Sequence, residues 1–255
     1  MIRLVHVSKT YPNGGTAVRN LSLNIEAGEF VVLIGPSGSG KSTTLSLINR
    51  LIEPSAGTIE IDGENIAQSE AVTLRRRIGF VFQGIGLFPH LTVAENIGIT
   101  PRLLGWQRSK VAERTQELLQ LVRLAPERYA ARYQRELSGG EQQRVGVARA
   151  LAAEPKIMLM DEPFGALDPL VRDELGAEVR SIHNRLGLTT VLVTHDMTEA
   201  LLLADRIVVM RDGGIVQSGT PAELVRAPAN DFVREMIENP RRRATRLADL
   251  LRAAP

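Results

Sequence analysis

The stretch that decides the fold is FVVLIGPSGSGKST, residues 30–43. It opens with an apolar run, Phe30–Ile34, of the kind that suits a parallel strand covered on both faces. The residues that follow fit the pattern G-x-x-x-x-G-K-[ST], and an amphipathic helical pattern continues over about Lys41–Leu51. A strand, a glycine-rich turn and a helix in this order predict a loop whose backbone N–H groups face a phosphate.

The predicted phosphate loop assigns chemistry to particular side chains. Lys41 can reach the β- and γ-phosphates of a nucleotide, and the Ser42 hydroxyl can ligate Mg²⁺. A glycine-rich turn with a chance lysine would give the same letters, but the strand before it and the helix after it favour nucleotide binding. The expected nucleotide-binding residues of this loop are Gly35, Pro36, Ser37, Gly38, Ser39, Gly40, Lys41, Ser42 and Thr43.

A second apolar run, Ile157–Met160, ends in two carboxylates, Asp161 and Glu162. Ligands of open α/β sheets gather at the carboxyl ends of the strands, so we expect both acids near the phosphates. Asp161 is predicted to hold Mg²⁺ through water, and Glu162 to orient and polarise the attacking water. A strand that merely ends in solvated acids is the alternative, which the phosphate loop disfavours.

The remaining patterns predict an α/β fold with two kinds of strand. Continuous apolar runs at Phe30–Ile34, Ile157–Met160 and Thr189–Val193 predict buried parallel strands. Alternating runs at Ile2–Val7 and Val18–Ile25, joined by a turn at residues 12–15, predict a hairpin of half-exposed strands. Further strands are predicted at Thr58–Ile61, Arg206–Met210 and Ile215–Ser218, the last two joined at Asp212-Gly213-Gly214. Further helices are expected at about Gln107–Leu124, Glu141–Ala153 and Pro169–Leu186, and capping boxes at Thr92/Glu95, Asp196/Glu199 and Thr220/Glu223. The region of about Gly84–Glu154 has no strand-like run, which predicts a helical insertion.

Bulk properties exclude several classes of protein. The chain of 255 residues has a net charge of +2, no cysteine and no apolar run long enough to cross a bilayer. Its first residues lack the apolar core of a signal peptide, so we expect a cytoplasmic protein. The segment from Pro240 holds five Arg and one Asp, which leaves the rest slightly acidic and argues against nucleic-acid binding. This Arg-rich tail, residues 241–255, is read as a solvated helical end, or alternatively as a contact to anionic lipid or a partner.

Leu137-Ser-Gly-Gly-Glu141 precedes another helical pattern and admits two readings. Ser138 and Glu141 have the spacing of a capping box, so the segment could simply start a helix. Glycines in a first turn are poor helix formers, however, and suit a backbone that approaches a ligand. Because a helix N-terminus binds anions, one chain then has two phosphate-facing sites about a hundred residues apart.

Taken together, these motifs resemble those of the ABC ATPases. The chain has GPSGSGKST, LSGGE followed by QQRVGVARAL, MDEP followed by FGALD, Thr194-His195-Asp196, and Gln83 after IGFVF, in the order typical of the family over about residues 1–225. The resemblance implies a P-loop NTPase core with a mostly parallel sheet, an antiparallel β subdomain and an inserted α-helical subdomain. It implies an ATPase domain over residues 1–240, with the core and β subdomain at about 1–83 and 155–240 and the helical subdomain at about 84–154.

The resemblance also implies a dimer. In the family, the LSGGE segment, called the signature, closes in one subunit over the ATP held by the other. The signature residues Ser138, Gly139, Gly140 and Glu141 are therefore expected to act on a second copy's nucleotide. The signature ends here in Glu where Gln is commoner, a mild departure. Further roles implied by resemblance are adenine stacking for Tyr11, a γ-phosphate switch for His195, a bridge between subunits for Asp168, and contact with Mg²⁺ or water for Gln83. His6, His90 and His183 show no constellation, and Trp106 is read as packing.

Membrane partners are implied in the same way. The segment Gly84–Thr100 is unusually apolar, and in the family this region grips the coupling helices of permease subunits. Internal packing is the alternative, and both readings can hold. The resemblance thus places the protein on the inner face of the membrane, bound to permeases and indirectly to an extracytoplasmic substrate-binding protein.

The runs INRLIEPSAGTI, QGIGLFPHLTVAENI and MDEPFGALDPLVRDEL resemble most the importer ATPases for quaternary-amine osmoprotectants such as glycine betaine, choline or carnitine. Many of those continue into paired CBS domains, whereas this chain is expected to stop after its short tail, which puts regulation of that kind in doubt. Importers of methionine, phosphonate or sulfate are the alternatives. A ribosome- or DNA-associated ABC protein would be expected to have two cassettes or long coiled coils, and a non-hydrolytic clamp would not need Glu162 and His195.

Overall fold

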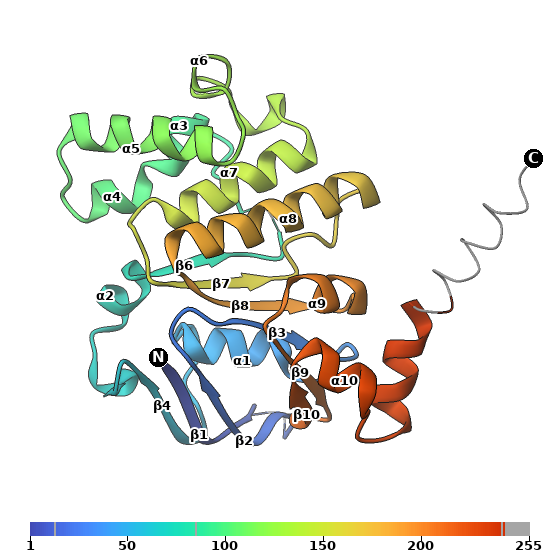
Figure 1. Cartoon of the computed structure of the whole chain (residues 1–255). Helices are drawn as coiled ribbons and strands as arrows, with labels where there is room; N and C mark the ends of the chain where they lie inside the picture. Colours follow the sequence, from blue (N-terminus) through green and yellow to red (C-terminus); the bar gives the residue numbers. More distant parts are fainter. Residues whose placement is uncertain (13, 85, 241, 243–255) are drawn as a thin grey trace, which may run out of the picture.

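In the computed structural model of the chain, two sheets and a block of helices surround the segment quoted above (Figure 1). The structure describes residues 1–12, 14–84, 86–240 and 242. The Arg-rich tail beyond residue 242 lies outside these ranges, so its two readings stay predictions. Among the described residues, none of the helices combines the length and apolar character needed to span a bilayer.

The central sheet has six strands in the order β10-β9-β3-β8-β7-β6. The pairs β3–β8, β3–β9, β7–β8 and β6–β7 are parallel, and only β9–β10 is an antiparallel hairpin. The strands are β3 Phe30–Ile34, β6 Ile78–Val81, β7 Ile157–Asp161, β8 Thr189–Thr194, β9 Arg206–Arg211 and β10 Gly214–Gly219. The predicted buried strands are therefore confirmed, whereas β6 was missed because its run is short and contains Gly79.

The smaller sheet is antiparallel and has the order β2-β1-β4-β5. Its strands are β1 Ile2–Thr10, β2 Thr16–Ile25, β4 Ala56–Ile61 and β5 Glu64–Asn65. The hairpin predicted from the alternating runs at the start of the chain is confirmed, with Ile2 opposite Ile25 and Thr10 opposite Thr16.

Alternate residues of β3 point to opposite faces of the central sheet and so enter two different cores. Val31 and Leu33 pack with residues of the small sheet and of α1 (Lys41–Ile48). Phe30, Val32 and Ile34 pack with residues of α7 (Gly139–Leu151), α8 (Pro169–Leu186) and α9 (Met197–Leu203). Because both faces are covered, a continuous apolar strand is the sequence that fits.

The predicted helical insertion is confirmed, since the described residues between 84 and 154 contain no strand. It lies beyond the β6 edge of the central sheet (Figure 1). Its helices are α3 Val93–Ile97, α4 Ile99–Leu103, α5 Arg108–Leu121, α6 Pro126–Tyr129 and α7, with a 3₁₀ turn at Gln134–Glu136. Elsewhere lie a 3₁₀ turn at Ile66–Gln68, α2 Ala71–Arg76, α10 Pro221–Arg226 and helical residues 231–240.

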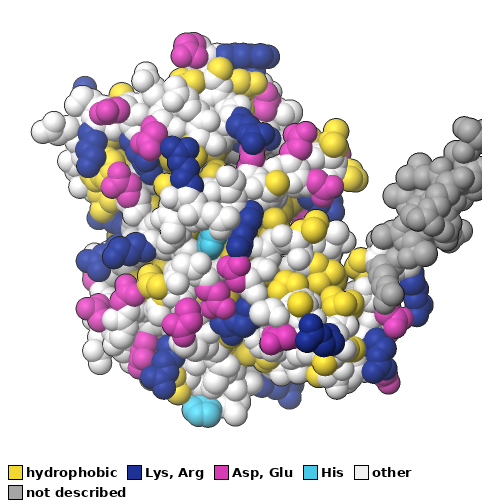
Figure 2. Space-filling view, in the orientation of Figure 1, with side chains coloured by type: hydrophobic (Ala, Val, Ile, Leu, Met, Phe, Trp, Pro, Cys, Tyr) yellow, Lys and Arg dark blue, Asp and Glu magenta, His cyan; other side chains and the backbone are white. Residues whose placement is uncertain are grey.

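Two of the three capping boxes predicted from the sequence are present in the structure. Thr92/Glu95 and Thr220/Glu223 form reciprocal capping boxes, as predicted. Asp196 caps α9, but the predicted box with Glu199 is wrong, because the Glu199 carboxylate instead accepts a hydrogen bond from the Thr194 hydroxyl at 2.5 Å. On the face shown in Figure 2, Lys and Arg are interspersed with Asp and Glu, and hydrophobic side chains gather over α9.

A buried carboxylate joins the insertion to the core. Glu178 of α8 is only 5% exposed and pairs with Arg144 of α7 and, at 2.7 Å, with Arg123 in the turn after α5. Arg144 also donates to the Val122 carbonyl at 3.2 Å. Removing one partner of a buried ion pair leaves the other charge desolvated and uncompensated.

We therefore expect Glu178→Ala to lower the free energy of unfolding by about 3 kcal/mol, measured by urea denaturation. The matched control is Asp173→Ala, an exposed acid on the same helix, which should change it by less than about 0.5 kcal/mol. Equal losses in the two variants would contradict a special contribution of Glu178.

Candidate functional site

The phosphate loop leaves β3 at Gly35 and enters α1 at Lys41. Gly40, the residue before the helix, has a left-handed backbone with φ of +96°. A Cβ there would also lie 2.4 Å from the carbonyl oxygen of Ala17 on β2. Glycine is thus required twice over at this position, by conformation and by space. The small sheet is packed directly against the loop as a result.

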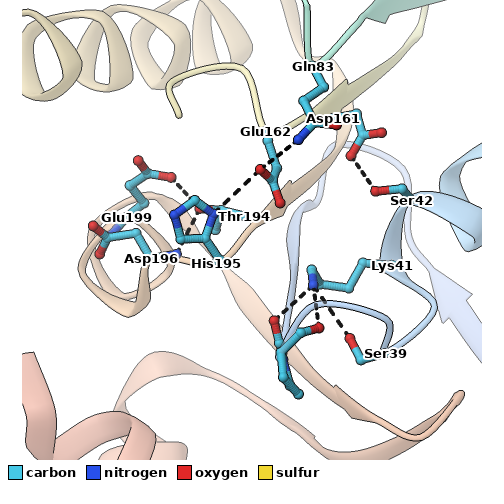
Figure 3. Close-up of polar contacts among 12 residues, drawn as sticks. Ser39, Lys41, Ser42, Gln83, Asp161, Glu162, Thr194, His195, Asp196 and Glu199 are labelled. Carbon is cyan, nitrogen blue, oxygen red and sulfur yellow. Dashed lines mark hydrogen bonds and ion pairs between the residues drawn. The ribbon is translucent and has the colours of Figure 1, made fainter. Parts of the chain in front are cut away.

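Lys41 lies inside the curl of the loop (Figure 3). Its Nζ donates to the carbonyls of Gly35 and Pro36 at 2.8 and 3.0 Å and lies 3.5 Å from Ser39 Oγ. Burial lowers the pKa of Lys41, and the carboxylates of Glu162 and Asp161 oppose that shift. The ammonium is therefore already withdrawn from water and faces oxygen atoms on several sides.

Ser42 and Asp161 meet at the carboxyl ends of the parallel strands, where the sequence predicts the acid to lie. The Ser42 hydroxyl donates to Asp161 Oδ1 at 2.7 Å. Burial raises the pKa of Asp161, against the hydrogen bond from Ser42 and with the help of the neighbouring Glu162 charge. A hydroxyl and one carboxylate beside a phosphate-binding loop are hard oxygen ligands of the number that Mg²⁺ commonly takes from protein. These residues fit that ion.

Glu162 is the point at which the predicted catalytic side chains converge (Figure 3). Gln83, which follows β6, donates from Nε2 to Glu162 Oε2 at 3.1 Å, and Nδ1 of His195, which follows β8, lies 3.5 Å from the same oxygen. Gln83 thus contacts Glu162 in this structure, and its predicted contact with Mg²⁺ stays a prediction.

The backbone of Glu162 is unusual. Its φ is +44°, in the left-handed region that a residue with a side chain rarely occupies. Its amide still donates to the Val193 carbonyl at 2.9 Å, which continues the pairing of β7 with β8 by one residue. Strained backbone of this kind persists where surrounding contacts fix it, and it clusters at functional sites.

The signature segment, residues 137–141, forms the start of α7 and is separate from the phosphate loop. Ser138 caps the helix in a reciprocal box with Glu141, so the structural reading is confirmed. A hollow of about 380 Å³ lies over it, lined by Ser138, Gly139, Gly140, Glu141, Arg144, Ala166, Leu167, Asp168, Val171 and Glu174. Asp168 caps α8 through the Val171 amide at 3.1 Å. The phosphate loop contributes no residue to this lining, so the two predicted phosphate-facing groups are separate within one chain.

Gly140 is explained by packing. A Cβ on Gly140 would lie 2.7 Å from Val171 Cγ1, whereas one on Gly139 would be 3.7 Å from Leu167 Cδ2, an ordinary contact. The first of these glycine positions in the helix therefore tolerates a methyl group and the second does not. This contact lets the signature helix lie directly on the start of α8.

Glu141 has a partner that sequence reasoning did not identify. Its Oε1 accepts the Tyr129 hydroxyl at 2.6 Å and its Oε2 accepts the Ser138 amide at 2.7 Å. Burial alone would raise the pKa of Glu141, but the hydrogen bonds from Tyr129 and Ser138 lower it overall. The Glu at this position therefore remains an acceptor that fixes the helix start.

Tyr11 lies just after β1 with its side chain partly exposed. Its amide donates to the Gly15 carbonyl at 2.9 Å, and Lys9 Nζ lies 5.5 Å from the centre of its ring. The next strand carries Ala17, which packs on Gly40, so Tyr11 belongs to the turn on the loop side of the small sheet. Its stacking on adenine stays a prediction.

Part of the apolar segment 84–100 packs inside the protein and part of it is exposed, so both internal packing and contact with permease subunits stay open for it. Leu87, Val93 and Ile97 are buried in the core of the helical insertion, and Asn96 holds the loop through Phe88 and Leu91. Phe88 is exposed. Internal packing thus explains most of the segment, and exposed aromatic surface remains beside it.

Three other side chains near the site have contacts that the sequence did not predict. Thr194 and Glu199 bond to each other beside His195, and Arg172 faces them from α8. The sequence marks Thr194 and Glu199 only as part of the histidine motif and of a capping box, and the only signal for Arg172 is its position one turn after Asp168. The histidines without a constellation have ordinary partners: His6 contacts Asn20, His183 contacts Thr190, and His90 lies against Phe88.

Comparison with known proteins identifies relatives. A model of the family described as ABC transporter matches residues 18–165. Among curated proteins, the chain is 58% identical over 237 residues to the glycine betaine/carnitine/choline transport ATP-binding protein OpuCA of Bacillus subtilis (strain 168). It is also 58% identical over 237 residues to the choline transport ATP-binding protein OpuBA of the same organism. Each match covers 93% of this chain and 62% of the relative, so the chain spans about three fifths of their length.

Comparison with solved structures gives a match of the same kind. A dimeric post-hydrolysis state of the ATP-binding cassette MJ0796 bound to ADP and Pi matches with a TM-score of 0.78 and 38% identity. The match covers 87% of this chain and 99% of that structure.

The glycine pair at the start of α7 gives a test of packing. We expect Gly140→Ala to lower the free energy of unfolding by about 1–3 kcal/mol, since the methyl group overlaps Val171, and Gly139→Ala to be near neutral. Adding Val171→Ala to the first variant should recover part of the loss. Denaturation curves of the four proteins check this, and equal effects of the two glycine substitutions would contradict it.

Proposed function

This chain belongs to the ABC transporter family, and on that premise we propose that it is the ATP-hydrolysing subunit of an importer for quaternary-amine osmoprotectants. It works as a head-to-tail dimer around two ATP molecules and drives membrane permease subunits. The observation that carries the ATPase proposal is the meeting of Lys41, the Ser42–Asp161 pair and the Gln83–Glu162–His195 group at one edge of the sheet (Figure 3).

The phosphates of ATP lie in the loop of residues 35–43. The Lys41 ammonium exchanges its loop carbonyls for oxygens of the β- and γ-phosphates, while backbone N–H groups and the start of α1 face the remaining charge. Tyr11, an exposed ring on the loop side of the small sheet, stacks on the adenine. Ser42, Asp161 and Gln83 would hold Mg²⁺, which would neutralise charge on the phosphate oxygens.

Hydrolysis is assigned to the group around Glu162. Its carboxylate orients and polarises the attacking water and accepts the proton that the water loses. Gln83 and His195 both approach the same Glu162 oxygen and so fix the direction in which the carboxylate faces. His195, with 62% of its side chain exposed, is free to contact the γ-phosphate.

The dimer follows from the separation of two sites in one chain. The hollow over Ser138 and Asp168 has helix N-termini but no residue of the phosphate loop. Each such hollow closes over the nucleotide held by the second copy, with Ser138, Gly139 and Gly140 toward the γ-phosphate and Asp168 bridging the subunits. The dimeric cassette bound to ADP and Pi supports this arrangement.

The partners and the cargo rest on the relatives. Exposed Phe88 and the surface around it fit a contact with permease subunits, which would hold the protein at the inner face of the membrane beneath a substrate-binding protein outside. The printed names of the relatives support glycine betaine, carnitine and choline as cargo. Methionine, phosphonate and sulfate are the alternative solutes.

Replacing Glu162 tests the ATPase proposal. Glu162→Gln should lower kcat for ATP hydrolysis by about 10²–10⁴-fold while ATP affinity stays close to that of the unmodified protein, because Lys41, Ser42 and Asp161 remain. Glu154→Gln, an exposed Glu just before the other end of β7, is the matched control and should leave kcat unchanged. Unchanged turnover in Glu162→Gln would remove Glu162 from this role.

Isolation of the assembled complex tests the partners and cargo. Tagged chain purified from the membranes of its source cells should bring with it multi-span permease proteins, identified by mass spectrometry. In vesicles with the binding protein present, glycine betaine, choline or carnitine should stimulate ATP hydrolysis, and methionine and sulfate should not. Stimulation by methionine or sulfate instead would replace the cargo, and recovery of ribosomal proteins would replace the class of function.

A further inference from the structure

Arg172 on the first turn of α8 faces acceptors on two other segments. Its Nη2 donates to the Leu167 carbonyl at 3.0 Å, its Nη1 lies 3.5 Å from Asp196 Oδ2, and its Nε lies 3.8 Å from Glu199 Oε1. Three quarters of the side chain is covered, since its exposed fraction is 25%. One guanidinium therefore joins the loop before α8 to the turn at the start of α9.

The acids on the α9 side hold the backbone around His195 (Figure 3). Asp196 caps α9 through its Oδ1, which accepts the Thr198 amide at 2.7 Å, and so leaves Oδ2 for Arg172. Glu199 accepts the Thr194 hydroxyl through Oε2 at 2.5 Å and leaves Oε1 for Arg172. The Thr194 hydroxyl in turn accepts the Asp196 amide at 3.0 Å. The residues on either side of His195 are thus fixed by groups that face Arg172.

On the other side, the Leu167 carbonyl belongs to the loop that presents Asp168. Two turns connect this loop to Glu162. In the first, the Gly165 amide donates to the Glu162 carbonyl at 3.3 Å, and in the second, the Leu167 amide donates to the Phe164 carbonyl at 3.1 Å. The contacts therefore form a closed circuit. It runs from Glu162 through the loop to Leu167, across Arg172 to Asp196, and through the neighbouring His195 back to Glu162 Oε2.

We propose that Arg172 is a positioning residue that couples the seating of the Asp168 loop to the placement of His195 against Glu162. The inference rests on the proposed function, because it takes Glu162 and His195 to act on ATP at a seam between two copies. A partner subunit that seats the Asp168 loop moves or fixes the Leu167 carbonyl. Arg172 passes that constraint to Asp196 and Glu199, and His195 is held in register with Glu162 only when the loop is seated.

The contacts require a guanidinium. Each of the three acceptors lies nearest a different nitrogen of the side chain, and a guanidinium offers three nitrogens with five N–H donors where a lysine offers a single nitrogen. Glu199 also depends on the pairing. Burial raises its pKa, against the lowering effects of the Thr194 hydroxyl and of Arg172.

Arg180 provides a matched control on the same helix. It donates from Nη1 to the Leu203 carbonyl at 3.0 Å and pairs through Nη2 with Asp205 at 2.6 Å. It thus ties α8 to the far end of α9 with similar contacts, but its partners do not adjoin His195. A merely structural role for Arg172 predicts that the two arginines behave alike.

The experiment measures kcat, KM and ATP affinity, together with the thermal unfolding temperature, for Arg172→Ala, Arg172→Lys and Arg180→Ala. Both Arg172 variants should lose about 10–100-fold in kcat with ATP affinity little changed, because the catalytic group is misplaced and the phosphate site is intact. Arg180→Ala should lower the unfolding temperature and leave kcat close to that of the unmodified protein. Arg172→Lys retains the positive charge, so it keeps the test decisive if the alanine variant fails to fold.

A double-mutant cycle supplies the second readout. In a His195→Ala background, Arg172→Ala should have little further effect on kcat, because Arg172 acts through His195. Additive losses, or equal losses of kcat in the Arg172 and Arg180 variants, would overturn the inference while the proposed ATPase stands. Absence of ATP hydrolysis by the unmodified dimer would instead overturn the proposed function and this inference with it.

Discussion

Parallel pairing of β3, β8 and β7 is the constraint on which the rest of the structure depends. Ile34 lies opposite Thr194, and Asp161 lies opposite Val193, so the three strands end at nearly the same level. The residues that follow them are therefore brought together by backbone hydrogen bonds alone: the phosphate loop, Glu162 and His195. The register of the sheet therefore brings these groups to the same end of the strands, and side-chain contacts then fix their orientation.

The sequence allowed the strands that supply this edge to be predicted, because strands buried on both faces are continuous apolar runs and the phosphate loop has a distinctive glycine spacing. It also allowed Asp161 and Glu162 to be placed near the phosphate loop, because ligands gather at the carboxyl ends of parallel strands, whereas the role of His195 came from the resemblance to the family. What could not be predicted depends on contacts between distant segments. The short strand β6 became a strand by pairing with β7, and Glu199 bonds to Thr194 although its spacing from Asp196 matches a capping box.

The same reasoning explains why particular side chains were missed or misread. Gly140 suits a ligand-facing backbone in the sequence, but its neighbour Val171 arrives from another helix and gives it a packing role. Arg172 has no pattern of its own, since its acceptors come from a preceding carbonyl and from acids more than twenty residues away. The helical insertion is similar: its existence is readable from the missing strands, whereas its attachment through Glu178, Arg144 and Arg123 is visible only in three dimensions.

The carbonyl cradle around Lys41 has a consequence for the thermodynamics of ligand capture. Stripping water from an ammonium group is costly, and here that cost is met when the chain folds, because Gly35 and Pro36 already surround the charge. An arriving triphosphate therefore substitutes one set of oxygens for another, and it brings formal negative charge where the cradle offered only dipoles. Because the ammonium is already dehydrated in the free protein, its desolvation does not reduce the free energy of binding. The phosphate loop is therefore preorganised for an anion.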